Sequence, residues 1–306
     1  MYDVIIVGGG PAGLSAALVL GRCRRRVLVC DAGRPRNAAA RHLHNFLTRD
    51  GIDPRELLRL GRAELEHYGV EFRAAEVTAA RRTKPAGFTV TLADKRTESA
   101  RKLLLATGVT DALPAVDGAR DYYGRGVHLC PYGDAWEYRD QPLAAYGADG
   151  DAAAGLALML TTWSARVTAC TNGARVGVRD RRRLERNGVA LRTEPLARLE
   201  GDGHHLRRLA FDAGPPLDCA AFFFNTDQAQ RSPLPAMLGC APARAGRHVA
   251  TGKKQRTRVP GLFLAGDAGG DVQFVIVAAA EGATAATALN RELQDEDTGD
   301  TRRRAR

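Results

Sequence analysis

The sequence of 306 residues lacks several features that would assign it to a class at once. It contains no CxxC pair and no Cys and His residues at the spacing of a zinc site, so neither a disulfide framework nor a bound metal is expected. Its six cysteines lie far apart, and we expect most of them to be buried as small hydrophobic residues. No apolar run reaches the roughly 20 residues that span a bilayer, which argues against a membrane partner.

The first residues lack the basic region and the cleavage site of a signal peptide. Acidic Asp3 follows Met1 and Tyr2 directly, and glycines interrupt the first apolar run. We therefore expect a cytoplasmic protein.

Aromatic residues are scarce, at 6%, whereas the net charge is +10. Arginines stand in short runs at 24–26, 181–183 and 302–304, without the interleaved aromatic side chains that favour binding of single strands. We interpret the excess charge as solvated surface and expect no nucleic-acid partner.

The order of elements predicts an α/β fold with two Rossmann-like, three-layer nucleotide-binding domains. An apolar strand, a glycine turn, a helix and a second strand follow one another twice. The first such unit covers 2–31 and the second covers 142–172. Later, LFLAGDAGG (262–270) gives another strand with a glycine turn, and a final helix is predicted over 274–293.

The first turn carries a GxGxxG pattern, in the sequence Gly8-Gly9-Gly10-Pro11-Ala12-Gly13. It follows a strand and opens a helix, and the next strand ends at Asp31, which is the context in which this pattern indicates a dinucleotide site. Gly8 permits the turn, Gly10 lets the backbone approach a pyrophosphate, and Gly13 allows close packing of helix on strand. The helix N-terminus, with Pro11 and Ala12, offers N–H groups to the phosphates, and Asp31 is suited to bind ribose hydroxyls.

Two later segments favour FAD over NAD as the bound dinucleotide. Ala106-Thr107-Gly108 closes one strand, and Gly266-Asp267 closes another shortly before an Ala-rich helix. An acid at that position can hydrogen-bond a ribityl hydroxyl, and the helix N-terminus can face the flavin pyrimidine ring, where negative charge gathers on reduction.

These motifs in this order resemble the low-molecular-weight thioredoxin reductase family over nearly the whole chain. Within it, CPYGDAWEYRDQPLAAYG, TTWSARVTACTNG, residues 228–232 and DVQFVIVAAAEGA are similar to the flavin-dependent dithiol oxidases of natural-product biosynthesis. The resemblance implies a homodimer and a split FAD domain over 1–112 and 240–293, with a smaller NAD(P)H-type domain inserted at 113–239. We expect the polar segment 294–306 to be a disordered tail.

The resemblance also implies flavin contacts outside the glycine motifs. By their position in the family pattern these are Asn37, Asn45, Val77, Gln273 and Phe274.

The redox motif of the family is incomplete here. In the family, two cysteines flank two residues, and exchange with substrate and with flavin needs both thiols. Cys130 matches the first cysteine, whereas Gly133 replaces the second. The chain is therefore not expected to be a working thioredoxin reductase.

Two interpretations of the remaining site stay open. Asp134 keeps the acidic position of the family and could act as a general base, with Cys130 forming a transient mixed disulfide with a substrate. Alternatively, Cys130 is vestigial and packed, Asp134 only caps a turn, and Gly133 opens space above the flavin for a substrate that needs no cysteine.

The second glycine turn departs from a dinucleotide fingerprint. In residues 147–152, Asp149 stands where a glycine would let the backbone approach a pyrophosphate. A carboxylate a few ångströms from the phosphates would cost on the order of 1–4 kcal/mol, because like charges repel. The next strand ends at 171–173 without the basic pair of the family reductases, and 225–227 reads NTD in place of a second ATG. NAD(P)H use is therefore doubtful.

If NAD(P)H does not reduce the flavin, the substrate must, and dioxygen is the simplest acceptor. The favoured hypothesis is an FAD-dependent oxidase of a small molecule, which could be a thiol-bearing secondary metabolite. The alternatives are an NAD(P)H- or ferredoxin-dependent flavin reductase with an unusual acceptor, and a non-catalytic flavin-binding protein.

Overall fold

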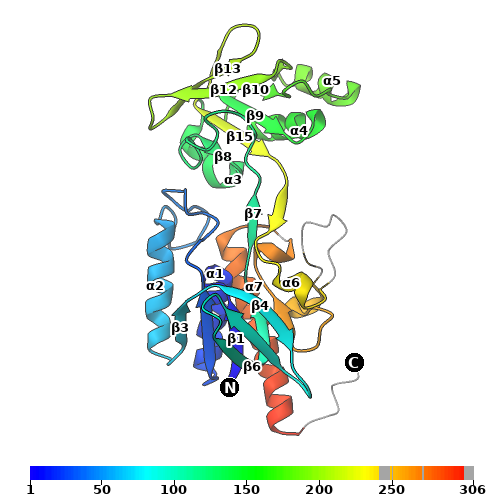
Figure 1. Cartoon of the computed structure of the whole chain (residues 1–306). Helices are drawn as coiled ribbons and strands as arrows, with labels where there is room; N and C mark the ends of the chain where they lie inside the picture. Colours follow the sequence, from blue (N-terminus) through cyan, green and yellow to red (C-terminus); the bar gives the residue numbers. More distant parts are fainter. Residues whose placement is uncertain (241–248, 250, 271, 300–306) are drawn as a thin grey trace.

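The computed structural model describes residues 1–240, 249, 251–270 and 272–299. Two lobes are joined by a narrow two-stranded ribbon (Figure 1). The larger lobe, called the first unit, is built around a seven-stranded sheet, and the smaller lobe, called the second unit, around a five-stranded sheet. The architecture is the predicted α/β class with two Rossmann-like units.

The sheet of the first unit is mostly parallel. In spatial order its strands are β3 (Glu71–Ala74), β2 (Val27–Asp31), β1 (Tyr2–Val7), β6 (Thr97–Leu105), β5 (Phe88–Leu92) and β4 (Val77–Arg82), and β17 (Leu262–Leu264) pairs with the end of β6. Only β5 runs in the opposite direction, antiparallel to both β4 and β6. Because parallel strands end at one edge, the loops after β1, β2, β6 and β17 meet there, which is where such sheets bind ligands.

Both faces of this sheet are buried, as its apolar strands require. Val4 and Ile6 of β1 face one core with three helices, and the alternating Ile5 and Val7 face a second core on the other side. The helices of the unit are α1 (Pro11–Arg22), α2 (Pro54–Glu66), α6 (Leu234–Met237) and α7 (Val275–Asp297), with short turns η2 (Lys253–Gln255) and η3 (Asp267–Gly269).

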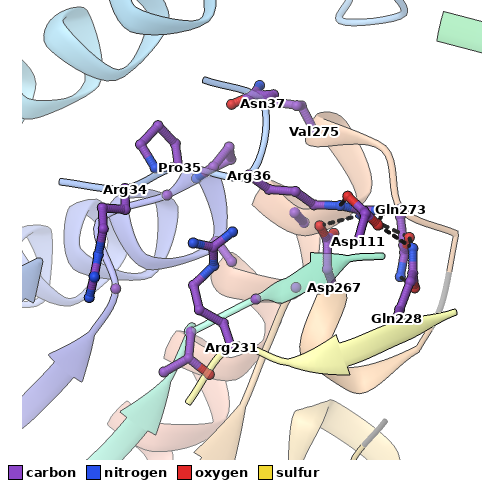
Figure 2. Close-up of a pocket in the computed structure, with 18 of the residues that line it drawn as sticks. Arg34, Pro35, Arg36, Asn37, Asp111, Gln228, Arg231, Asp267, Gln273 and Val275 are labelled. Atoms are coloured by element: carbon purple, nitrogen blue, oxygen red, sulfur yellow. Dashed lines mark hydrogen bonds and ion pairs between the residues drawn. The ribbon is translucent and has the colours of Figure 1, made fainter. Parts of the chain in front are cut away.

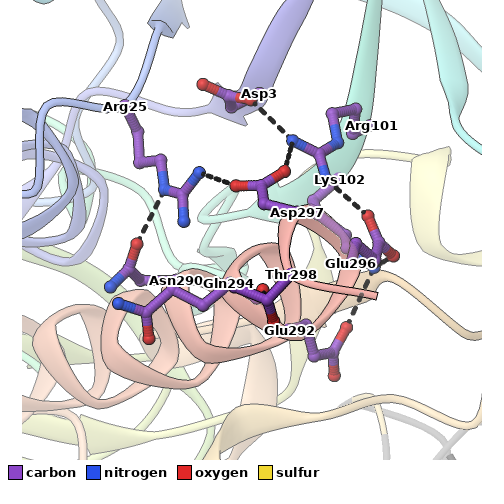
Figure 3. Close-up of polar contacts among 10 residues, drawn as sticks. All are labelled: Asp3, Arg25, Arg101, Lys102, Asn290, Glu292, Gln294, Glu296, Asp297 and Thr298. Carbon is purple, nitrogen blue, oxygen red and sulfur yellow. Dashed lines mark hydrogen bonds and ion pairs between the residues drawn. The ribbon is translucent and has the colours of Figure 1, made fainter. Parts of the chain in front are cut away.

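Helix α7 runs further than the sequence suggested, so the expectation of a disordered tail from residue 294 is wrong up to residue 299. The helix continues to Asp297, whose carboxylate lies 2.6 Å from Arg25, and Glu296 lies 2.7 Å from Lys102 (Figure 3). Acidic side chains that looked like a solvated tail are paired with basic groups on the first unit. The rest of the predicted tail, 300–306, lies outside the described residues.

The second unit repeats the parallel arrangement on a smaller scale. Its sheet has the order β11 (Ala190–Arg192), β10 (Val167–Cys170), β9 (Leu143–Gly147), β15 (Ala221–Asn225) and β8 (Val127–His128). A separate antiparallel sheet contains β12 (Leu196–Gly201), β13 (Leu206–Phe211) and β14 (Leu217–Asp218). The helices are α3 (Pro131–Asp134), η1 (Trp136–Tyr138), α4 (Gly150–Leu160) and α5 (Val178–Arg186).

The ribbon between the units pairs β7 (Val109–Asp111) with β16 (Gln228–Gln230). After β16 the chain is already back in the first unit, because Leu234 and Leu238 belong to the core on one face of its sheet. The division at 112/113 and 239/240 remains a prediction, and the packing of Leu234 favours a return before residue 239.

In the described part of the chain, no helix is long and apolar enough to cross a membrane. Nor do these residues bring together three or more His, Cys, Asp or Glu side chains that could hold a metal ion.

Candidate functional site

A cavity of about 1120 Å³ lies at the edge where the parallel strands of the first unit end. Its wall includes the loops after β1, β2, β6 and β17, and the second unit adds α3 and the side chains of Leu156 and Met159. The volume exceeds the roughly 300–1,000 Å³ of ordinary small-ligand pockets. The cavity therefore has room for a large ligand and is closed by both units.

The first glycine turn forms one end of this cavity with the geometry that the sequence predicts. Gly8 has φ +110°, and a Cβ there would lie 2.2 Å from the Ala106 carbonyl oxygen. A Cβ on Gly13 would lie 1.9 Å from the Gly8 oxygen, so α1 packs directly on the turn. A Cβ on Gly10, in contrast, would meet no atom within 4 Å. The turn is tight toward the protein and open toward the cavity.

The N-terminus of α1 can therefore receive an anion. Gly10 is the N-cap and has no side chain to satisfy the first N–H groups, and Pro11 occupies the first turn. Gly10, Pro11 and Ala12 line the cavity, whereas Gly13 does not. Free N–H groups and the positive end of the helix dipole are suited to a pyrophosphate.

Two further polar groups of the cavity wall fit a dinucleotide. Asp31 ends β2, and its carboxylate accepts a hydrogen bond of 2.9 Å from Arg62 while lining the cavity. The buried Thr107 hydroxyl has no hydrogen-bond partner among the described residues, although Ala106, Thr107 and Gly108 all line the cavity. Since buried hydroxyl groups are rarely unpaired, Thr107 is a candidate ligand group.

The late turn at Gly266 and Asp267 reaches the same cavity, as predicted. Asp267 accepts a 2.8 Å hydrogen bond from Arg36, and the Gly266 N–H donates to the buried carboxylate of Glu281 at 2.6 Å. Asn37, Val77, Gln273 and Phe274, expected from the family pattern, also line the cavity.

Asn45, like Gly13, is a predicted cofactor residue that does not line the cavity. Its backbone has φ +64°, and its side-chain amide donates a 2.7 Å hydrogen bond to the carbonyl of Tyr132. Asn45 thus joins a loop of the first unit to helix α3 of the second, and in this arrangement its amide is engaged by protein.

Arg36, which the sequence did not single out, is the centre of a polar network at the base of the ribbon (Figure 2). It donates to both oxygens of Asp111 at 2.6 and 2.7 Å and to Gln273 at 2.8 Å. Gln228, across the ribbon from Asp111, donates to that carboxylate at 2.8 Å. Burial acts to lower the pKa of Arg36, but the hydrogen bonds to Asp111 and the charge of Asp267 raise it above its usual range. This network ties both ribbon strands to the cavity wall.

Cys130 lies at the start of α3 and lines the cavity from the second unit. Burial raises the pKa of its thiol, an effect that backbone hydrogen bonds from Gly133 and Tyr132 partly offset. All six cysteines are free thiols. Cys30 also borders the cavity, but it is 1% exposed within β2, and burial raises its pKa to about 11. Cys30 and Cys130 are therefore not joined by a disulfide.

Gly133 occupies the position where a second thiol would stand, and it does not itself line the cavity. A Cβ at this position would meet no atom within 4 Å, and the residue lies in α3 without a positive φ. The glycine is therefore not required by the backbone.

Asp134, at the end of α3, lines the cavity with a partly exposed carboxylate. One of its oxygens lies 3.1 Å from Nδ1 of His128, a buried residue that the sequence reasoning did not name. The carboxylate is thus oriented by a partner and faces the cavity close to Cys130.

The second glycine turn is filled by the chain itself. Asp149 is the N-cap of α4, and its carboxylate accepts a 2.7 Å hydrogen bond from the N–H of Ala152. A Cβ on Gly150 would lie 2.1 Å from the carbonyl oxygen of Arg175, so the segment after β10 packs on the turn. Asp151 holds that segment by accepting a 2.8 Å hydrogen bond from the N–H of Gly177. None of the residues 147–151 lines the cavity.

Comparison with known proteins agrees with this geometry. A profile of the pyridine nucleotide-disulphide oxidoreductase family matches residues 2–282. A probable thioredoxin reductase of Arthroderma benhamiae is 32% identical over 96% of this chain and 81% of its own length. The thioredoxin reductase tcpT of Claviceps purpurea is 29% identical over 96% of this chain and 94% of its own length.

Among solved structures, that of HlmI superposes with a TM-score of 0.94 at 36% identity, covering 97% of this chain and 94% of its own. Proteins of this kind bind FAD, and the open glycine turn, Asp31, the unpaired Thr107 hydroxyl and the Asp267 turn fit that cofactor.

Proposed function

This chain belongs to the pyridine nucleotide-disulphide oxidoreductase family, and we propose that it is an FAD-dependent oxidase of a small molecule that uses dioxygen as the electron acceptor. The substrate class that we favour is a thiol-bearing secondary metabolite, bound between the flavin and the Cys130–Asp134 segment. The proposal carries two further expectations, a homodimer and a cytoplasmic location.

The observation that carries the proposal is the difference between the two helix N-termini. The one in the first unit is open to the cavity at Gly10, whereas the one in the second unit is capped by the Asp149 carboxylate and covered by the segment after β10. An anion such as the pyrophosphate of NADPH would have to displace a carboxylate that already satisfies this helix. Electrons are therefore proposed to come from the substrate.

The chain's own side chains have distinct parts in this reaction. Asp134, on the cavity wall, is placed to accept a proton from a substrate thiol, since a general base must be within hydrogen-bond reach of that proton. Burial and, to a smaller extent, the charge of Asp134 raise the pKa of Cys130, which favours its neutral thiol form. Cys130 lines the cavity in which the substrate would bind.

The proposed reaction balances without a second protein thiol. Two S–H bonds of a dithiol are broken and one S–S bond forms, which releases two protons and two electrons. FAD, when bound, supplies the two-electron acceptor between thiol and dioxygen. Dioxygen takes up both electrons and both protons and becomes hydrogen peroxide.

Oxygen consumption with a panel of small dithiols and monothiols tests this proposal. We expect at least one dithiol to drive equal consumption of dioxygen and formation of peroxide, without NADPH. Asp134→Asn should lower the rate about 100-fold or more, the usual effect of losing a general base, and Cys130→Ser should lower it much less. Oxygen consumption driven by NADPH alone would instead favour a reductase, in line with the names of the relatives. Sedimentation velocity tests the dimer.

A further inference from the structure

His128 is a buried titratable residue to which the proposed reaction gives no part. Its side chain is 6% exposed, on β8 of the second unit, two residues before Cys130. The ring lies between Tyr138 and Phe223, with ring centroids 5.3 and 5.6 Å away. Both of its nitrogens have polar partners, which is the normal requirement for a buried imidazole.

The partners fix which nitrogen carries the proton. The backbone N–H of Gly126 lies 3.1 Å from Nε2 of His128 and can only donate, so Nε2 must accept. The hydroxyl of Tyr138 is 3.2 Å from the same nitrogen. In a neutral imidazole the proton then resides on Nδ1, which lies 3.1 Å from Oδ1 of Asp134. His128 is therefore an Nδ1–H donor aimed at the Asp134 carboxylate.

We propose that His128 is a positioning residue that holds the Asp134 carboxylate toward the substrate cavity by donating the Nδ1 proton. This inference rests on the proposed function, because Asp134 is the base assigned there. It also excludes a second possible role for His128, that of a proton shuttle. A proton shuttle would need Nε2 to become protonated, which would set two donors, the Gly126 N–H and Nε2–H, against each other in a buried site.

A matched pair of substitutions separates a role of His128 in positioning Asp134 from a role in filling space. The amide nitrogen of His128→Asn can occupy the place of Nδ1 and still donate to Asp134. The amide of His128→Gln reaches the place of Nε2 instead, so it can accept from Gly126 but leaves Asp134 without its donor. Tyr138→Phe serves as a control, because Gly126 alone still fixes the tautomer. Retained FAD content and circular dichroism identify variants that fold.

The first readout needs no substrate. Peptide-resolved alkylation of Cys130 by iodoacetamide is followed against pH, with Asp134→Asn as reference. Burial raises the pKa of Cys130, and the Asp134 charge raises it further, so Asp134→Asn should move the alkylation profile to lower pH. We expect His128→Gln to move it in the same direction, since Asp134 is free to turn away. His128→Asn and Tyr138→Phe should keep the wild-type profile.

The second readout is thiol oxidation with a dithiol that the wild type accepts. We expect His128→Gln to lower the rate roughly tenfold, as loss of an orienting partner commonly does, and His128→Asn to restore most of it. The inference is overturned if His128→Gln alkylates and turns over like the wild type, or if His128→Asn is as impaired as His128→Gln. If no dithiol is oxidised at all, the proposed function fails, whereas the alkylation profiles still decide the role of His128.

Discussion

The two glycine turns of this chain follow the same plan and differ in what stands at the start of the helix. In the first unit, Gly10 leaves the N-terminus of α1 open to a large cavity. In the second unit, Asp149 places a carboxylate on the N-terminus of α4, and the carbonyl of Arg175 packs on Gly150. One turn is open to a ligand, and the other is closed by a structural cap.

Under the proposed function, this difference means that a Rossmann-like unit keeps its fold when its binding surface is filled. An Asp N-cap satisfies the same N–H groups that a phosphate would use, so the helix loses no stability when the ligand site is lost. Four predictions test this difference between the two glycine turns.

Substitution at the first turn should have the largest effect. Gly8→Val places a branched side chain at φ +110° and against the Ala106 oxygen, so we expect a protein with almost no FAD. The flavin-to-protein absorbance ratio after purification measures this. Gly133→Ala is the matched control, because a Cβ there would meet no atom within 4 Å. Equal FAD content in the two variants would contradict the assignment.

Removal and addition of nucleotides should act on the two units unequally. Protein stripped of FAD should have a free energy of unfolding about 4 kcal/mol lower than protein in a free FAD concentration 1,000 times the dissociation constant. Addition of NADPH should leave thermal unfolding unchanged, because the second turn is already capped. A rise in unfolding temperature with NADPH concentration would show that the second unit still binds it.

Gly133→Cys should restore a thiol pair in the cavity. Its backbone accepts a side chain without clash, and cysteines at positions i and i+3 of a short helix can form a disulfide. We expect two fewer titratable thiols in the oxidised protein than in the reduced variant, and flavin reduction by dithiothreitol. NADPH should still not reduce this variant. Reduction by NADPH would mean that the missing thiol, rather than the closed second turn, is what separates this chain from a reductase.

Substitution of the cap of α4 should have the smallest effect. Asp149→Ala removes the hydrogen bond to Ala152 and should lower the free energy of unfolding by about 1 kcal/mol. It should not create NADPH binding, because Arg175 still covers Gly150. Urea unfolding measures the first effect and fluorescence titration with NADPH the second. Tight NADPH binding by this variant would show that Asp149 alone closes the site.

The sequence was most informative where structure is local. The first glycine turn, Asp31 and the two later strand ends were predicted because each is a short pattern at the end of an apolar strand. The course of α7 was predicted only to residue 293, since the pairing of Asp297 with Arg25 joins distant segments. The sheet β12–β14 was not foreseen, and a bulge between Leu196 and Arg198 interrupts the alternation that would have indicated its first strand.

The parts of the site that depend on tertiary contacts could not be predicted. The Arg36 network joins four segments separated in sequence, so no local pattern indicates it. His128 stands beside Cys130 in the sequence, but its role follows from a backbone N–H and a carboxylate that only the fold brings to its ring. Asn45 was assigned from its place in a family pattern, and here it bonds the second unit instead.

The central claim is that electrons enter the flavin from a thiol substrate and not from NADPH. Anaerobic absorbance titration of the purified yellow protein tests it most directly. The flavin band should persist with excess NADPH and be bleached by a small dithiol, and it should return when air is admitted. Rapid bleaching by NADPH, with no response to any thiol, would contradict the account.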